Sequence, residues 1–141
     1  MKIYFAGAIR GGREETDIYN NIITYLSSKT EVLTEHVGST ELTTIGETNL
    51  FDEEIFIRDM EWIQSADLVI AEVTTPSLGV GYELGIAEKL NIPVLCLYRS
   101  IQGKRLSAMI SGNEKFKCQT YLTLDDAKVH INKFLKQEQK I

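Results

Sequence analysis

Two acidic residues lie where an amphipathic helix would place apolar side chains. On a wheel of about 100° per residue, Glu83 falls within the apolar arc of a helix predicted at 81–91. Asp59 falls in the middle of the apolar face of a helix predicted at 52–66. A carboxylate on a packing face is rare unless a partner or a ligand satisfies it. Both residues are therefore candidate catalytic groups.

Each carboxylate also has a structural interpretation. Glu83 could be a capping-box or first-turn residue, since helix N-terminal amides favour an anion there by about 0.3–1 kcal/mol. Asp59 could be paired with an arginine in the core. One such residue alone would favour these interpretations, whereas two of them beside a glycine-rich loop favour a site. An ionised, partly desolvated Glu83 would be a competent nucleophile.

Two carboxylates around one reaction centre suit the cleavage of a glycosidic bond. One attacks or stabilises the anomeric carbon, while the other manages protons or holds the sugar. The transition state resembles an oxocarbenium ion, so negative charge beside that carbon stabilises it. A phosphate-binding loop next to the pair would imply that the sugar carries a phosphate.

Two glycine-rich segments are the candidate phosphate loops. "GAIRGG" at 7–12 places Arg10 between glycines, where loop amides could ring a phosphate and the guanidinium could pair with it. This segment is neither GxxxxGK[ST] nor GxGxxG, so the motif alone is not specific. On the second segment, "TTPSLGVG" at 74–81, Ser77 and Gly79 are the candidate phosphate contacts.

Other polar residues have less specific patterns. Tyr4 could reach Glu83 from the first predicted strand, or it could be an ordinary core residue. His36 follows the second predicted strand and is a candidate substrate contact, but His130 is remote from it in sequence, so no zinc cluster is expected. Ser107 in "RLSAMI" could be a helix cap, and no GxSxG or catalytic triad is suggested.

Short apolar segments alternate with helical patterns along the chain. Strands are predicted at 2–7, 31–36, 67–73, 92–98 and 117–122, and helices at 17–29, 52–66, 81–91 and 124–140. This alternation predicts a single-domain open α/β fold, Rossmann- or flavodoxin-like, with a five-stranded parallel sheet in the order 2-1-3-4-5. Ligands bind such sheets where the order reverses, here beyond the strands ending at Gly7 and Val73.

The bulk composition fits one soluble domain spanning 1–141. The net charge of −5 provides no basic field for nucleic acid or an anionic membrane, and no apolar run approaches the about 20 residues that span a bilayer. Cys96 and Cys118 have no metal-ligand spacing, and Cys96 reads as a small buried hydrophobe. A cytoplasmic protein is therefore expected, although so small a chain could also enter the nucleus.

Several segments in order resemble a known family. "YFAGAIRGGRE", "VLTEHV", "FIRDMEWIQSADLVIAEVTTPSLGVGYELG" and "RLSAMI" resemble the 2'-deoxynucleoside 5'-monophosphate N-glycosidases of the Rcl type, within the nucleoside 2-deoxyribosyltransferase superfamily. The likeness runs from the first strand to about residue 112 and is thin beyond it. It implies hydrolysis of a deoxynucleoside monophosphate to a free base and 2-deoxyribose 5-phosphate, with no metal or organic cofactor.

The resemblance also implies roles for individual residues. Glu83 matches the nucleophile that forms a covalent deoxyribosyl intermediate, Asp59 the assisting carboxylate, and Tyr4 the tyrosine that positions the nucleophile. The matching phosphate and sugar contacts are Gly7, Ala8, Ile9, Arg10, Gly11, Ser77 and Gly79. Ser107 matches a serine that reaches the phosphate in the neighbouring subunit's site, which implies a homodimer.

One departure from the family pattern concerns the first loop. Family members commonly read "GSIRGG", and Ala8 here replaces the serine, so a hydroxyl donor is lost while the backbone amide remains. Other functions stay open at this level: a deoxyribosyltransferase that passes the sugar to another base, a ribonucleotide hydrolase such as a CMP glycosidase, or a nucleotide-binding module without catalysis.

Overall fold

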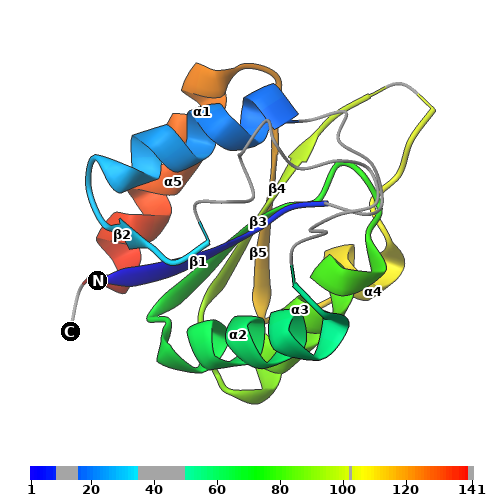
Figure 1. Ribbon diagram of the computed structural model, residues 1–141. Helices are drawn as coiled ribbons and strands as arrows, with labels where there is room; N and C mark the ends of the chain where they lie inside the picture. The colour runs from blue at the N-terminus through cyan, green and yellow to red at the C-terminus, as the bar shows by residue number, and fades with distance from the viewer. Residues whose placement is uncertain (9–15, 35–49, 102, 140–141) are drawn as a thin grey trace.

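Five parallel strands form one sheet in the order β2-β1-β3-β4-β5 (Figure 1). This computed structural model describes residues 1–8, 16–34, 50–101 and 103–139. The strands are β1 (Lys2–Ala6), β2 (Glu31–Val32), β3 (Leu68–Glu72), β4 (Val94–Arg99) and β5 (Phe116–Tyr121). The strand order and the parallel pairing confirm the sequence prediction. The end of the second predicted strand, residues 35 and 36, lies outside the described residues.

Helices connect the strands and cover the sheet. They are α1 (Thr16–Ser27), α2 (Asp52–Ser65), α3 (Leu78–Lys89), α4 (Ala108–Ser111) and α5 (Leu124–Glu138). Of the two residues whose types could cap α5, Thr123 and Asp125, it is Thr123 that does so: its hydroxyl accepts a hydrogen bond from the amide of Asp126. Helix α3 begins three residues before its predicted start, since Ser77 caps it.

The two faces of the sheet have separate cores because side chains alternate along each strand. Helices α1 and α5 cover one face, and α2, α3 and α4 cover the other (Figure 1). The first core includes Ile3, Phe5, Ile70, Leu95 and Leu97, and the second includes Tyr4, Ala6, Val69, Ala71 and Cys96. Tyr4 therefore lies on the side of α3, and Cys96 is buried as predicted.

The register brings the carboxyl ends of β1 and β3 together, with Ala6 opposite Ala71. Gly7 follows β1, where a Cβ would lie 3.1 Å from the ring of Tyr19 on α1. A side chain at position 7 would crowd that ring, so glycine fits this close approach of the chain. Both β1 and β3 therefore end at the edge of the sheet where the strand order reverses. None of the described helices is both long and apolar enough to cross a membrane.

Candidate active site

A cavity of about 1030 Å³ lies at this edge of the sheet. Gly7 after β1 and the segment from Val73 to Ser77 after β3 contribute to its wall, together with residues of α2, α3 and α4. A cavity of this volume is large enough to enclose a nucleotide. Its position agrees with the crevice expected at the point where the strand order reverses.

Glu83 projects into the cavity from α3 and is half-buried. Because α3 begins at Leu78, Glu83 belongs to its second turn, so the expectation of a first-turn carboxylate is wrong. Gly79 lies one turn earlier, and a Cβ there would stand 3.8 Å from both Glu83 Oε1 and Ser77 Oγ. The absence of a side chain at Gly79 leaves room beside the carboxylate and the serine hydroxyl.

The pKa of Glu83 is raised from its ordinary value to about 7. Burial is the main cause, and the negative charge of Asp59 adds to it. A hydrogen bond from the phenol of Tyr4 opposes both effects by stabilising the ionised form, but burial prevails. Glu83 therefore exchanges its proton near neutral pH, and a carboxyl group so perturbed in a cleft is a candidate functional residue.

Tyr4 is both a core residue and a partner of Glu83, which resolves the two interpretations of its sequence position. It is 2% exposed and packs in the core beneath α2 and α3. Burial, the charges of Glu83 and Asp59, and the hydrogen bond to Glu83 raise the pKa of Tyr4 above its usual value. The phenol thus stays protonated and serves as a donor to the carboxylate.

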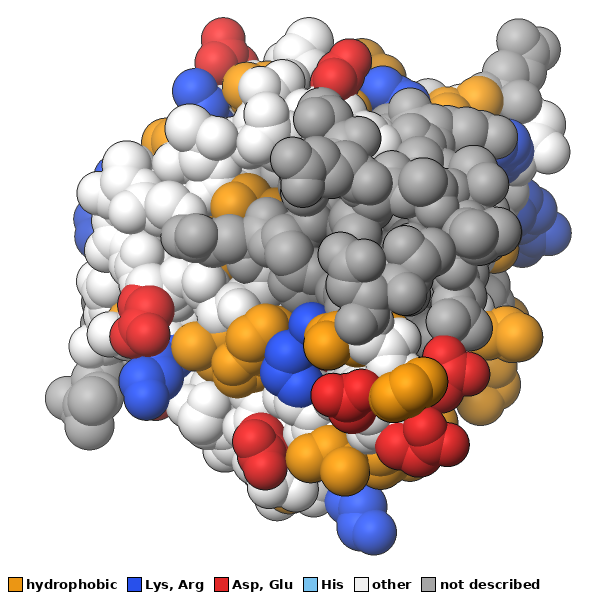
Figure 2. All heavy atoms as spheres, in the orientation of Figure 1, with side chains coloured by type: hydrophobic (Ala, Val, Ile, Leu, Met, Phe, Trp, Pro, Cys, Tyr) orange, Lys and Arg blue, Asp and Glu red, His pale blue; other side chains and the backbone are white. Residues whose placement is uncertain are grey.

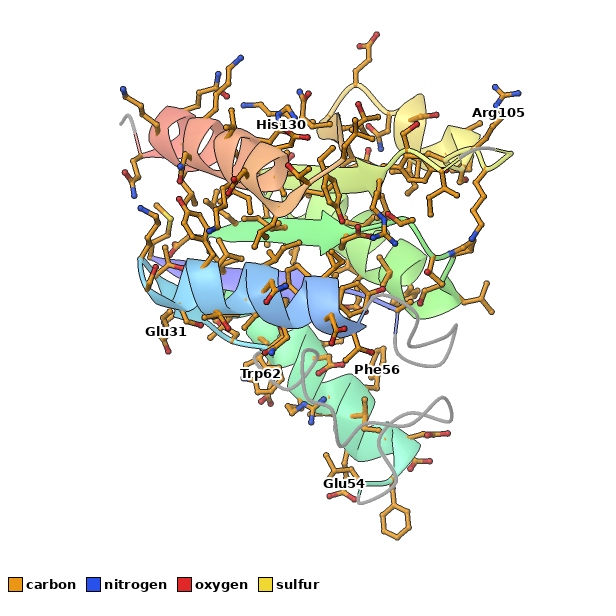
Figure 3. All side chains as sticks on the ribbon, turned by 90° about the horizontal axis from the view of Figure 1, so that it is seen from above. Glu31, Glu54, Phe56, Trp62, Arg105 and His130 are labelled. Atoms are coloured by element: carbon orange, nitrogen blue, oxygen red, sulfur yellow. The ribbon has the colours of Figure 1, made fainter. Side chains whose placement is uncertain are left out.

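Asp59 lines the same cavity from α2 and pairs with its neighbour Arg58. Asp59 Oδ1 accepts hydrogen bonds from Arg58 Nε at 3.0 Å and from Nη2 at 2.9 Å. The guanidinium lies 4.7 Å from the ring of Trp62, on the next turn of α2 (Figure 3). A helical wheel predicts that Arg58 points away from the apolar face of α2, and this prediction is wrong, because its long side chain bends back to Asp59 and the cavity. The arginine pairing foreseen for Asp59 exists, at the cavity wall rather than in the core.

The loop between β3 and α3 supplies hydroxyl groups. Thr74 and Thr75 line the cavity with Ser77 and Gly79. Ser77 Oγ accepts a hydrogen bond from the amide of Val80 at 3.3 Å, and so begins α3. The two threonines were not singled out from the sequence, although hydroxyl residues directly after a buried strand are a usable signal.

The loop after β1 is described only in part. Gly7 lines the cavity, whereas Ala8 is fully buried and its amide donates a hydrogen bond to the Tyr19 hydroxyl at 3.1 Å. That amide is thus already engaged, so it is not the open donor expected after the loss of a serine hydroxyl. The remaining candidates lie outside the described residues: Ile9, Arg10, Gly11 and His36.

Ser107 begins the short helix α4, as its interpretation as a cap foresaw. Its hydroxyl accepts a hydrogen bond from the amide of Met109 at 3.2 Å, and its exposed side chain lines the α4 side of the cavity. Nearby Arg105 also lines the cavity and is exposed at the surface (Figure 3). Within the described ranges, no three His, Cys, Asp or Glu side chains are grouped to hold a metal ion.

Known relatives share this sequence over most of its length. A "5-hydroxymethyl-dUMP N-hydrolase" of Tetraodon nigroviridis is 52% identical over 113 residues, which cover 79% of this chain and 80% of the relative. The Homo sapiens protein of that name is 52% identical over 111 residues, covering 78% of this chain and 64% of its own. A Nematostella vectensis protein, provisionally named as a 2'-deoxynucleoside 5'-phosphate N-hydrolase, is 58% identical over 118 residues, covering 82% and 80%.

A solved structure shares the fold. The CMP N-glycosidase BcmB of Clostridium botulinum superimposes with a TM-score of 0.63 over 94% of this chain and 99% of that chain, at 15% sequence identity. At that identity the likeness concerns the fold alone. The sequence model of the nucleoside 2-deoxyribosyltransferase family matches residues 3–132. Together with relatives more than half identical over most of its length, this match shows that the chain belongs to the nucleoside 2-deoxyribosyltransferase family.

Proposed function

We propose that this chain hydrolyses the N-glycosidic bond of 2'-deoxynucleoside 5'-monophosphates to a free base and 2-deoxyribose 5-phosphate. The observation that carries the proposal is Glu83, which lines a nucleotide-sized cavity with Asp59 and has a pKa of about 7. The named N-hydrolases among the relatives support the same reaction. A passive phosphate binder has no need of two carboxylates beside its loop.

Glu83 acts as the nucleophile in this scheme. Its carboxylate oxygen bonds to the anomeric carbon while the carbon–nitrogen bond breaks, and the bonding electrons leave with the base. Asp59 handles the proton that the departing base takes up. Water then gives up a proton to Asp59 and attacks the anomeric carbon, which breaks the bond to Glu83 and yields the sugar phosphate. Tyr4 holds the carboxylate in place by donating its hydrogen bond.

The phosphate end of the substrate binds at the start of α3. Ser77 contributes a hydroxyl, and Gly79 allows close approach of the backbone. The N-terminus of a helix favours an anion because its amides point outward and its dipole is positive there. Since this end of α3 lies one turn from Glu83, a phosphate there places the sugar beside the carboxylate.

A homodimer completes the site, with Ser107 of one subunit reaching the phosphate bound by the other. Around Ser107, Leu78 is 97% exposed and Met109 is 81% exposed, which is unusual for large apolar side chains. Among the described residues, no atom lies within 4 Å of a Cβ placed on Gly81 or Gly85, so a second helix could approach α3 closely. Figure 2 shows hydrophobic and acidic side chains gathered along the lower part of one face, where α2 and α3 lie in Figure 1.

A substrate panel tests the reaction. The protein is incubated with deoxynucleoside monophosphates including 5-hydroxymethyl-dUMP, with the matching ribonucleotides and with unphosphorylated deoxynucleosides, and free base is followed by chromatography. We expect base release from the deoxynucleotides, at least about tenfold faster than from the unphosphorylated compounds because a phosphate contact is lost. No release from any deoxynucleotide, or faster release from the ribonucleotides, would contradict the proposal.

An added free base separates hydrolysis from transfer. A second base is included in the same reaction, and the products are searched for a new nucleotide. We expect 2-deoxyribose 5-phosphate to remain the sugar product, because water is the acceptor. Accumulation of the exchanged nucleotide in place of the sugar phosphate would assign the chain to the transferases.

A further inference from the structure

A third carboxylate lies close to the β3–α3 loop, on the opposite face of the sheet from Glu83. Glu72 is the last residue of β3 and is 0% exposed. It follows Ile70 by two residues and so shares the face covered by α1 and α5. A carboxylate buried this deeply is costly unless its oxygens are hydrogen-bonded. The hydrolytic scheme above gives Glu72 no role.

Both oxygens of Glu72 accept hydrogen bonds from groups near the cavity. Oε1 accepts from the amide of Thr74 at 2.7 Å, and Oε2 accepts from the Thr74 hydroxyl at 2.8 Å. Oε2 also accepts a short hydrogen bond from the phenol of Tyr121 at the end of β5. One carboxylate therefore holds Thr74 at its backbone and at its side chain, which fixes the turn directly after β3.

Thr74 connects this carboxylate to the neighbouring strand as well. Its hydroxyl oxygen accepts a hydrogen bond from the amide of Arg99, the last residue of β4, at 2.8 Å. The turn is thus tied to the carboxyl ends of three strands, through Glu72, Arg99 and Tyr121. Three hydrogen bonds converge on this one carboxyl group, so the network anchors the turn.

The next residue, Thr75, differs from Thr74 in its hydrogen bonding. The Thr75 hydroxyl is buried, and within the described ranges it has no hydrogen-bond partner. An unsatisfied buried hydroxyl opposes the conformation that contains it. Other contacts of the loop, among them the hydrogen bonds of Glu72 to Thr74, offset this cost.

We propose that Glu72 is a positioning residue for the phosphate end of the substrate. It fixes Thr74, and through the short segment that follows it holds the β3–α3 loop in place at the cavity wall. Thr74 and Ser77 line one cavity with Glu83, but Glu83 lies in the second turn of α3, so a displaced turn shifts the loop contacts more than the catalytic carboxylate. This inference rests on the proposed function, because it assigns the phosphate to this loop.

Two buried tyrosines on neighbouring strands provide a matched test. Tyr121→Phe removes the donor to Glu72, whereas Tyr98→Phe removes a buried hydroxyl of β4 that has no partner among the described residues. The values of kcat and KM for a deoxynucleoside monophosphate are measured with the inhibition constant of inorganic phosphate. For Tyr121→Phe we expect KM and that constant to rise about 3–10-fold, with kcat within about twofold of wild type. Tyr98→Phe should match wild type in all three.

The pattern of the changes separates positioning from a general structural role. A variant Tyr121→Phe with a lower melting temperature and a lower kcat, but an unchanged KM and phosphate inhibition constant, would overturn the proposal. Unchanged values throughout would overturn it as well. Should Tyr121→Phe fail to fold, Thr74→Val takes its place with Thr74→Ser as the rescue: KM should rise in the first and return towards wild type in the second.

Failure of the proposed function can be recognised separately. If the wild-type protein releases no base from any nucleotide, that function fails, and calorimetric titration of inorganic phosphate into wild type, Tyr121→Phe and Tyr98→Phe still tests the role of Glu72. We expect weaker phosphate binding in Tyr121→Phe alone. Equal binding of phosphate by all three proteins would reject the positioning role.

Discussion

Glu72 is the last residue of β3, and Glu83 lies in the second turn of α3, which follows it. The two glutamates differ in burial, in hydrogen bonding and in the face of the sheet on which they lie. Glu72 is fully buried on the α1 and α5 side of the sheet, and both of its oxygens accept hydrogen bonds. Glu83 is half-buried on the other side, with the phenol of Tyr4 as its hydrogen-bond donor and a pKa of about 7. The more deeply buried carboxylate is thus the better satisfied one.

The comparison teaches that hydrogen bonding, rather than burial alone, separates a structural carboxylate from a reactive one. Burial disfavours the charged form of any acid, and donors restore it. Where donors occupy both oxygens, as at Glu72, the group holds its neighbours in place. Where one phenol faces an acid in an open cavity, as at Glu83, the carboxylate keeps an oxygen for a substrate.

Replacing Glu83 tests the reactive half of the comparison and should give the largest effect. Glu83→Gln keeps the size of the side chain but removes the nucleophilic oxygen, so kcat for a deoxynucleoside monophosphate should fall about 10³-fold or more. The rate of base release is the measurement, with the exposed Glu61→Gln on α2 as a control expected to match wild type. Retention of the wild-type rate by Glu83→Gln would show that Glu83 does not react.

Asp59 extends the comparison to a carboxylate that is already paired. In Asp59→Asn the proton of the departing base can no longer be handled, and Arg58 loses its anionic partner. We expect kcat to fall about 10²-fold. Steady-state rates with a substrate whose base leaves more readily should recover part of this loss. An equal loss with good and poor leaving groups would place Asp59 outside the proton transfer.

Tyr4→Phe tests whether the phenol of Tyr4 helps to keep Glu83 ionised at neutral pH. The Tyr4 hydrogen bond lowers the pKa of Glu83, so its removal should raise that pKa above about 7. In wild type, kcat/KM should rise with pH through about 7 as Glu83 ionises; in the variant this limb should move to higher pH. The expected loss at pH 7 is about fivefold for a rise of one pKa unit, and it shrinks at pH 9. An unshifted profile in Tyr4→Phe would refute this role of the phenol.

The smallest expected effect is a gain in the free energy of unfolding when Glu83 is replaced. The pKa of Glu83 is higher in the folded state than in the unfolded state. The contribution of Glu83 to the free energy of unfolding is therefore fully present below the unfolded pKa, and it is lost as pH rises through about 7. Glu83→Gln mimics the neutral form and should raise the free energy of unfolding by about 1–3 kcal/mol at pH 8, with little change at pH 4. Denaturant unfolding at both pH values measures this. A gain of the same size at pH 4 would point to packing instead of charge.

Much of the fold could be predicted because it depends on local pattern. Continuous apolar segments separated by helical ones determine a parallel sheet, and the two glycine-rich segments follow β1 and β3 at its edge. Glu83 and Asp59 could be found for a related reason, since an acid on an apolar helical face departs from an otherwise regular pattern. The start of α3 was misjudged although Ser77 is a favourable cap, because the proline and glycines around it suggested a longer loop.

The remaining features depend on contacts that no local pattern contains. A helical wheel separates Arg58 from Asp59, yet a flexible guanidinium can bend back to the adjacent carboxylate. Glu72 is visible in the sequence as one acid within the apolar segment "DLVIAEV", but its partner Tyr121 lies on a strand far along the chain. The contrast between the two glutamates therefore emerges only once the sheet is assembled.

The stereochemistry of the reaction tests the central claim, attack by Glu83 on the anomeric carbon, most directly. Hydrolysis of a deoxynucleoside monophosphate is run with methanol as a competing acceptor, and the methyl glycoside 5-phosphate is examined by NMR before its anomers equilibrate. Two successive displacements, first by Glu83 and then by methanol, predict retention of the β configuration. A product of inverted configuration, or an anomeric mixture at the earliest times, would contradict a covalent intermediate on Glu83.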